Sequence, residues 1–197
     1  MALGNIGTIF RQGRIQQVNN ALVEEVFVRD NTSGYVLISY ADRAPNGITF
    51  INTLRLNVNR NTLIFNGVGR RLRISDIHRG MWVDAAFSPV MTRSIPPQSN
   101  AFLIVVRRSG NRPSNNVTSG RIVSVDVRNR AFNIGRPNDP ARQTRFNITN
   151  NTLIRNRAGN PIRLSNLGIG QNVRVIHADY MTASIPPQTT AFYVQVI

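Results

Sequence analysis

The residues able to support acid–base or metal chemistry are few in this chain. Its two histidines, His78 and His177, occupy unmatched positions of an internal repeat, and it has no cysteine. A metal site normally takes three or four ligands from His, Cys and carboxylates. The carboxylates considered for an acid–base couple show neither pairing nor periodicity: Asp84, Asp126, Asp139 and Asp179. We therefore expect no catalytic residue, no metal and no cofactor, and a protein that is not an enzyme.

A proline-rich pentapeptide occurs twice and leaves two interpretations open. Proline-rich extended segments are recognition elements in other proteins. A rigid crossover between strands would need the same residues, because proline leaves the ladder and holds the preceding residue extended. We favour the crossover, since a shared folding requirement accounts for two copies. The residues are Ser94, Ile95, Pro96, Pro97 and Gln98, and then Ser184, Ile185, Pro186, Pro187 and Gln188.

The charge of the chain is strongly positive and is carried only by arginine. The formal net charge is +15, and all 24 basic residues are arginines. Such a charge normally indicates a polyanionic partner. Arginine makes fixed, planar hydrogen bonds and is weakly hydrated, whereas nucleic-acid binders usually combine it with lysine. The arginines are also spread along the chain, which favours many local contacts over a single electrostatic stripe.

An internal duplication sets the organisation of the chain. Residues 61–64, Asn-Thr-Leu-Ile, return as residues 151–154, and residues 91–98 return as 181–188 at the same offset of 90. About 20 identities fall in about 50 columns of this register, which chance composition does not give. Upstream, residues 13–15 match residues 120–122 at an offset of 107, so the first copy contains 17 additional residues. This predicts a longer hairpin in the first copy.

The elements that carry these residues are expected to be strands. Short alternating apolar runs broken by Asn, Gly and Pro are typical of an all-β protein. We predict two tandem barrel or sandwich modules at residues 13–109 and 120–197, with an inserted hairpin at about 21–42. Residues 1–12 would form an apolar N-terminal arm and residues 110–119 a polar linker. In the second copy, strands are expected at 121–127, 145–149, 172–178 and 191–196.

The step Leu167-x-x-Gly170-x-x-Val173 lies between the middle strands of the second copy, with Ile77, Gly80 and Val83 at the matching positions of the first. Strands, one helical turn, a glycine in the left-handed conformation and another strand would follow in order. This order resembles the five-stranded oligonucleotide/oligosaccharide-binding (OB) barrels, and more narrowly small bacterial OB-like domains of unknown function. The resemblance implies a fold and no activity. Barrels that hold single strands stack bases on aromatic residues, whereas the aromatic residues here are expected to alternate mostly inward.

The N-terminal arm favours a function in assembly. Its apolar residues have no counterpart in the second copy, and the outer positions of the last strand of the first copy are apolar too. We expect the arm to insert into a neighbouring subunit and the strand to be covered on both faces. The expected assembly contacts are Leu3, Ile6, Ile9, Phe10, Leu103 and Val105.

The preferred functional hypothesis is thus a self-assembling structural subunit of an extracellular filament, appendage or coat at a cell or spore surface. Its partner would be the protein itself, joined head to tail. The alternative is a polyanion-binding module, with nucleic acid or an acidic polysaccharide lying across arginines of both modules. No apolar run reaches the ~18 residues of a membrane helix, and no conventional secretion signal is visible. We therefore expect no membrane insertion.

Overall fold

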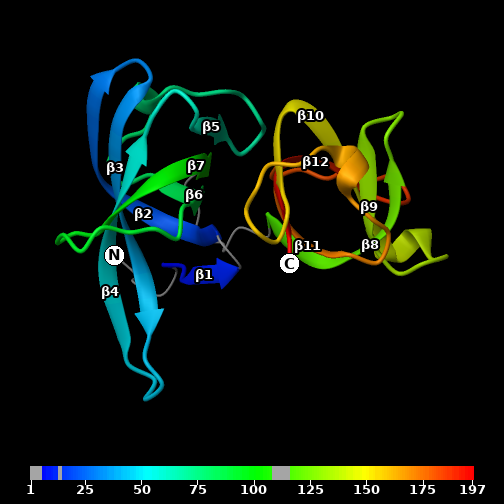
Figure 1. Cartoon of the computed structure of the whole chain (residues 1–197), viewed down its shortest axis with the longest axis horizontal. Coiled ribbons are helices and arrows are strands. Elements are labelled where there is room, and N and C mark those ends of the chain that lie inside the picture. The colour runs from blue at the N-terminus through cyan, green and yellow to red at the C-terminus, as the bar shows by residue number, and fades with distance from the viewer. Residues whose placement is uncertain (1–5, 13–14, 108–115) are drawn as a thin grey trace. The chain divides into compact units, whose positions relative to one another are not determined.

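The computed structural model describes residues 6–12, 15–107 and 116–197 (Figure 1). The chain divides into two compact units, residues 1–114 and 115–197. The first contains β1 (Ile9–Gln12), β2 (Ile15–Asp30), β3 (Ser33–Arg43), β4 (Thr49–Val58), β5 (Leu63–Asn66), the 3-10 turn η2 (Ile74–Asp76), β6 (Trp82–Phe87) and β7 (Gln98–Arg107). The second contains β8 (Val117–Asp126), β9 (Ala131–Gly135), η3 (Pro140–Arg142), β10 (Gln143–Arg155), η4 (Leu164–Asn166), β11 (Asn172–His177) and β12 (Gln188–Val196).

Five strands of the first unit close into a barrel. The ring runs β2-β3-β4-β7-β6 and returns to β2, and each neighbouring pair is joined by a ladder. All of these pairs are antiparallel except β4 with β7, which is parallel. Each strand of the ring thus has a neighbour on both sides over at least part of its length, which is how small β proteins limit exposed ladder groups.

The second unit repeats this strand order in a closed barrel, β8-β9-β10-β12-β11. Its parallel pair, β10 with β12, corresponds to β4 with β7. Both units are therefore OB-like barrels, and the prediction of two such all-β modules is confirmed. The glycines expected in the left-handed conformation have that geometry, with φ of 86° at Gly80 and 91° at Gly170.

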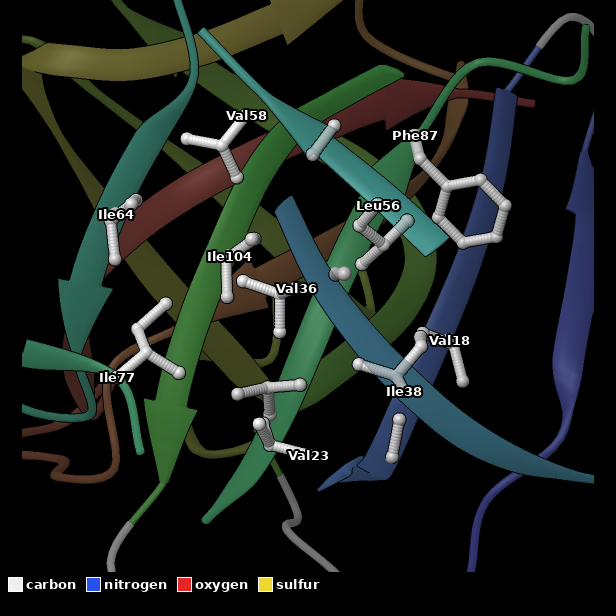
Figure 2. Packing of buried hydrophobic residues seen from close by; sticks show 14 of the residues in the cluster. Val18, Val23, Val36, Ile38, Leu56, Val58, Ile64, Ile77, Phe87 and Ile104 are labelled. Carbon is white, nitrogen blue, oxygen red and sulfur yellow. The ribbon is translucent and has the colours of Figure 1, made fainter. Parts of the chain in front are cut away.

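Each barrel has its own apolar interior, built from the inward positions of alternating strands. Figure 2 shows the interior of the first barrel, where Val18, Val36, Leu56 and Ile104 come from four different strands and are buried. In the second barrel, Phe132 and Phe146 stack with ring centroids 5.4 Å apart. Several of the inward strand positions are β-branched, and β-branched side chains pack well on a pleated surface.

The additional residues of the first copy lengthen its strands. β2 and β3 have 16 and 11 residues, whereas the corresponding β8 and β9 have 10 and 5. Residues 21–42 thus lie within one continuous hairpin of the barrel wall. β9 was not among the expected strands. It has only five residues between two turns, and four of them, including the polar Asn133, are buried, so it shows no alternation of apolar and polar residues.

The start of the second module differs from the expected one. Residues 117–119 belong to β8 and not to a linker, because Thr118 and Ser119 pair with Val175 and Arg174 of β11. The remainder of the expected linker, residues 110–115, lies outside the described residues, as does Leu3 of the arm.

The arm has partners within its own unit. β1 pairs antiparallel with β2, from Ile9 opposite Val18 to Gln12 opposite Ile15. The Gly7 amide donates to Asn20 O at 3.0 Å, and Gly7 O accepts from the Ala41 amide at 2.8 Å. The arm was expected to insert into a neighbouring subunit, but residues 7–12 pair within their own unit, because β3 leaves the N-terminal part of one edge of β2 unpaired.

Candidate functional site

A ring pair and a guanidinium group lie together on the outer face of the first barrel. Phe27 of β2 pairs with Tyr35 of β3, and their rings stack with centroids 5.3 Å apart. The Arg55 guanidinium carbon, from β4, lies 3.8 Å from the Tyr35 ring centroid. We call Phe27, Tyr35 and Arg55 the Tyr35 cluster. Phe27 is 48% exposed, so one ring of the pair is open to solvent.

A carboxylate fixes the position of the central ring. The Tyr35 hydroxyl donates a hydrogen bond to Glu25 Oε1, on the same face of the sheet. This hydrogen bond, with smaller contributions from desolvation and the Glu25 charge, raises the pKa of Tyr35 above its ordinary value. The ring is therefore neutral at physiological pH, with its face against a cation and its edge anchored.

A β-bulge explains why sequence alternation did not reveal this cluster. Val23 faces the interior opposite Ile38, and strict alternation would put Phe27 on that same side. The ladder with β3 shifts register between Val23 and Glu25, so that Val26 becomes the next inward residue. Phe27 consequently faces outward, and the expectation that aromatic residues alternate inward is wrong there. The adjacent acidic pair of residues 24 and 25, which interrupts an apolar run, is the sequence signal that could have located the bulge.

The second barrel keeps the arginine of the Tyr35 cluster but not its rings. Arg145 aligns with Arg55, but its guanidinium donates to Asp126 at 3.0 Å. Asn147 aligns with Asn57. The ladder partner of Asn57 is Tyr35, whereas that of Asn147 is Ala131 of β9. Hydrogen bonds from Asn129, and then from Arg145, lower the pKa of Asp126 to about 2. The second barrel therefore presents a neutralised arginine and no stacking ring on this face.

The repeated pentapeptides form matching loops before β7 and before β12. In the first, Thr92 and Gln98 are joined by two hydrogen bonds, at 2.9 and 3.0 Å, and the Ser94 hydroxyl donates to Pro96 O at 2.8 Å. Thr182, Ser184, Pro186 and Gln188 make the same contacts, with distances of 2.8 to 2.9 Å. The Ile95–Pro96 and Ile185–Pro186 peptide bonds are both cis.

Each loop is hydrogen-bonded to the backbone of the neighbouring strand, at the arginine residue Arg55 of β4 or Arg145 of β10. The amide of Arg55 donates to Pro97 O at 2.9 Å, and the amide of Arg145 donates to Pro187 O at 2.9 Å. The apex isoleucines point away from the barrels, with Ile95 99% exposed and Ile185 75% exposed. The pentapeptide thus combines internal hydrogen bonds with one apolar side chain held in solvent.

The structure does not bring the expected assembly contacts together. Leu103 and Val105 are fully buried within the chain, so neither offers surface to a partner. Ile9 packs against the interior of the first barrel, and Ile6 is half-buried. Among the apolar residues of the arm that the structure describes, only Phe10 is exposed (42%).

The histidines and acidic residues are not grouped to hold a metal ion in the described part of the chain. His177 is buried, with Nδ1 2.9 Å from Ala178 O and Nε2 3.0 Å from the Thr118 hydroxyl. His78 is exposed and belongs to the other unit. Over residues 6–12, 15–107 and 116–197, no three residues of the types His, Cys, Asp and Glu are grouped to hold a metal ion. None of the helical turns in those ranges has the length or the apolar character needed to cross a membrane.

Comparison with known proteins gives likenesses to solved structures. No family model matches the chain, and no curated protein sequence does. A solved structure similar to it is a deletion and point mutant of the single-stranded DNA binding protein from Thermus aquaticus. The alignment covers 98% of this chain and 95% of that chain, with 10% identity and a TM-score of 0.29. The fold class of this chain, an OB-like barrel in each unit, therefore rests on its own strand order. The most distinctive chemistry on its described surface is that of the Tyr35 cluster.

Proposed function

We propose that the protein is a non-enzymatic polyanion-binding module that holds single-stranded nucleic acid on the Tyr35 cluster of its first barrel. The observation that carries the proposal is the stacked ring pair with an arginine over it, on the outer face of an OB-like barrel. Every base has a flat face that can stack on an exposed ring, and Arg supplies a cation for the adjacent phosphate. The net charge of +15 supports attraction of such a strand.

Fluorescence anisotropy with a labelled single-stranded oligonucleotide tests this proposal. Base–aromatic stacking contributes about 1–3 kcal/mol per base, so Phe27→Ala should weaken binding roughly 5- to 150-fold. Tyr180→Ala is the matched control, because Tyr180 is also an exposed aromatic residue (46%) but lies in the second barrel. Equal affinities of the two variants would contradict the proposal.

An acidic polysaccharide separates the two kinds of polyanion. It carries charge without bases, so its binding would depend on arginine and not on the Phe27 ring. If Phe27→Ala leaves both polymers bound as in the unmodified protein, binding is purely electrostatic and lies elsewhere.

Self-association is a second candidate function, supported by the exposed apex isoleucines of the two loops. An apolar side chain that is almost wholly exposed in the same place on both barrels is suited to a protein contact. Ile95→Ser with Ile185→Ser should then reduce association in sedimentation velocity. Ile169→Ser is the control, because Ile169 is 74% exposed but lies outside these loops. An extracellular or surface location remains a prediction that accompanies this candidate.

A further inference from the structure

A pocket of the first barrel is lined by three arginines. It has a volume of about 290 Å³ and lies where the β2–β3 turn, the end of β4 and the segment before η2 meet. Arg60, Arg71 and Arg73 line it together with Asn31 and Thr32 of the turn. All three arginines are exposed, so their guanidinium groups are accessible to a soluble ligand.

No carboxylate is among the residues that line this pocket. The nearby Asp30 accepts hydrogen bonds from Thr32 and Ser33 within its own turn, and Asp76 accepts the Arg73 amide at 2.7 Å. Within the described residues, none of the three arginines forms an ion pair. Three like charges around one hollow repel each other, and an anion placed among them would remove that repulsion.

The internal duplication shows that the fold does not need these charges. The residues aligned with Arg60, Arg71 and Arg73 are Asn150, Pro161 and Arg163. The apolar and hydroxyl members of the lining are kept in type, since Thr62, Ile64 and Leu72 align with Thr152, Ile154 and Ile162. The two additional arginines are thus a property of the first barrel and not of the architecture that both barrels share.

We propose that this pocket binds a phosphate group, with Arg60, Arg71 and Arg73 as its ligands. The guanidinium fork matches phosphate oxygens in a bidentate geometry, and such charge-assisted hydrogen bonds are about twice as strong as neutral ones. The site is independent of the Tyr35 cluster, because it needs no base to stack. The phosphate can come from a small pyrophosphate-type anion or from the end of a nucleic-acid strand.

Calorimetric titration of the full-length protein with inorganic pyrophosphate at low ionic strength tests the site. Arg60→Asn with Arg71→Gln should weaken binding at least 10-fold. Arg70→Gln with Arg93→Gln removes the same charge from exposed arginines outside the pocket, and should weaken binding less than 3-fold. An equal loss in both double variants, or no binding by the unmodified protein, overturns the proposal. If the double variant does not fold, Arg60→Asn alone replaces it. Its affinity for pyrophosphate should fall about 3-fold or more, compared with the same Arg70→Gln, Arg93→Gln control.

The source of the phosphate is identified with one oligonucleotide, prepared with and without a 5′-phosphate. If the strand end enters the pocket, the 5′-phosphate should raise affinity in the unmodified protein and not in the pocket variant. If pyrophosphate binds and neither oligonucleotide does, the pocket proposal stands for a small anion and the stacking proposal fails. If oligonucleotides bind and pyrophosphate does not, the pocket proposal fails and stacking stands.

Discussion

Asp84 and Arg107 form a buried ion pair across β6 and β7. The Arg107 Nε and Nη2 atoms lie 2.8 and 2.5 Å from Asp84 Oδ2, and the two side chains are 4% and 0% exposed. The second carboxylate oxygen accepts the amide of Asn20 at 2.8 Å. The second barrel has Arg174 at the position of Asp84, so this pair is a property of the first barrel.

Replacing Asp84 by Asn should lower the free energy of unfolding by about 3–5 kcal/mol, because it removes the buried negative charge opposite the Arg107 guanidinium. The only tryptophan, Trp82, lies in β6, so its fluorescence during urea unfolding reports on this barrel. The more exposed pair of Arg145 and Asp126 lies in the second barrel and provides the comparison, followed by circular dichroism, and Arg145→Gln should cost about 1 kcal/mol or less. Similar losses for the two variants would show that burial of the pair is not what matters.

The β2–β3 turn should make stability depend on pH. Hydrogen bonds from Ser33, and then from Thr32, lower the pKa of Asp30 from 3.8 to about 2. A carboxylate whose pKa is lower in the folded state stabilises the fold above pH 3.8, and this contribution disappears as the pH falls through about 2. Asp30→Asn should therefore lose less stability than the unmodified protein between pH 5 and pH 2, measured by thermal unfolding. Parallel curves would exclude this role.

At the scale of elements, β1 should stabilise the barrel that it lines. Deleting residues 1–12 removes its ladder and both hydrogen bonds of Gly7, one of which pairs the amide of the buried Ala41. We expect the free energy of unfolding of the first barrel to fall by about 2–4 kcal/mol. Deleting residues 1–5 is the control and should have a small effect. If the protein without residues 1–12 were as stable as the full-length protein, the arm would not stabilise its own barrel, and a contact with another molecule would be favoured.

The proline loops should contribute independently to the two barrels. Pro97→Ala and Pro187→Ala each increase the freedom of the unfolded chain by about 0.4–1 kcal/mol, so each should lower the melting temperature by a few degrees. The double variant should lose roughly the sum, since distant sites usually add. If either change left stability intact and abolished association or ligand capture, its loop would be a contact surface.

Sequence patterns predict the elements better than they predict the site. The offset of 90 and the alternating apolar runs indicate two barrels, because a repeated inward face must be buried in each copy. A bulge near Glu24 makes strict alternation from Val23 place Phe27 on the wrong face, and alternation cannot locate a bulge without knowledge of the partner strand. β1 also escaped prediction, because it pairs with the part of β2 that β3 does not reach, and only the ladders show where that part lies.

At the scale of the whole molecule, the two barrels share a frame and differ in exposed chemistry. The first has an unneutralised arginine over a ring and a second group of three arginines at a pocket. The second pairs its equivalent arginine with Asp126. We expect polyanion binding to depend on variants in the first barrel and to be insensitive to Arg145→Gln.

Salt separates the two candidate functions by magnitude. A single strand that contacts about five phosphates should lose roughly 100-fold in affinity between about 50 and 200 mM salt. Association through Ile95 and Ile185 should barely respond, because apolar contacts are not screened. Anisotropy and sedimentation velocity over the same salt series measure both effects. Salt-insensitive binding of the oligonucleotide would contradict the polyanion proposal.

The bulge near Glu24 has a consequence for how β2 tolerates a change in length. Loss of one codon there would remove the bulge and leave the residues after it paired with β3 as they are now, so Val26 would stay inward and Phe27 outward. One residue can thus be gained or lost at this point of the strand without turning the ring away from solvent.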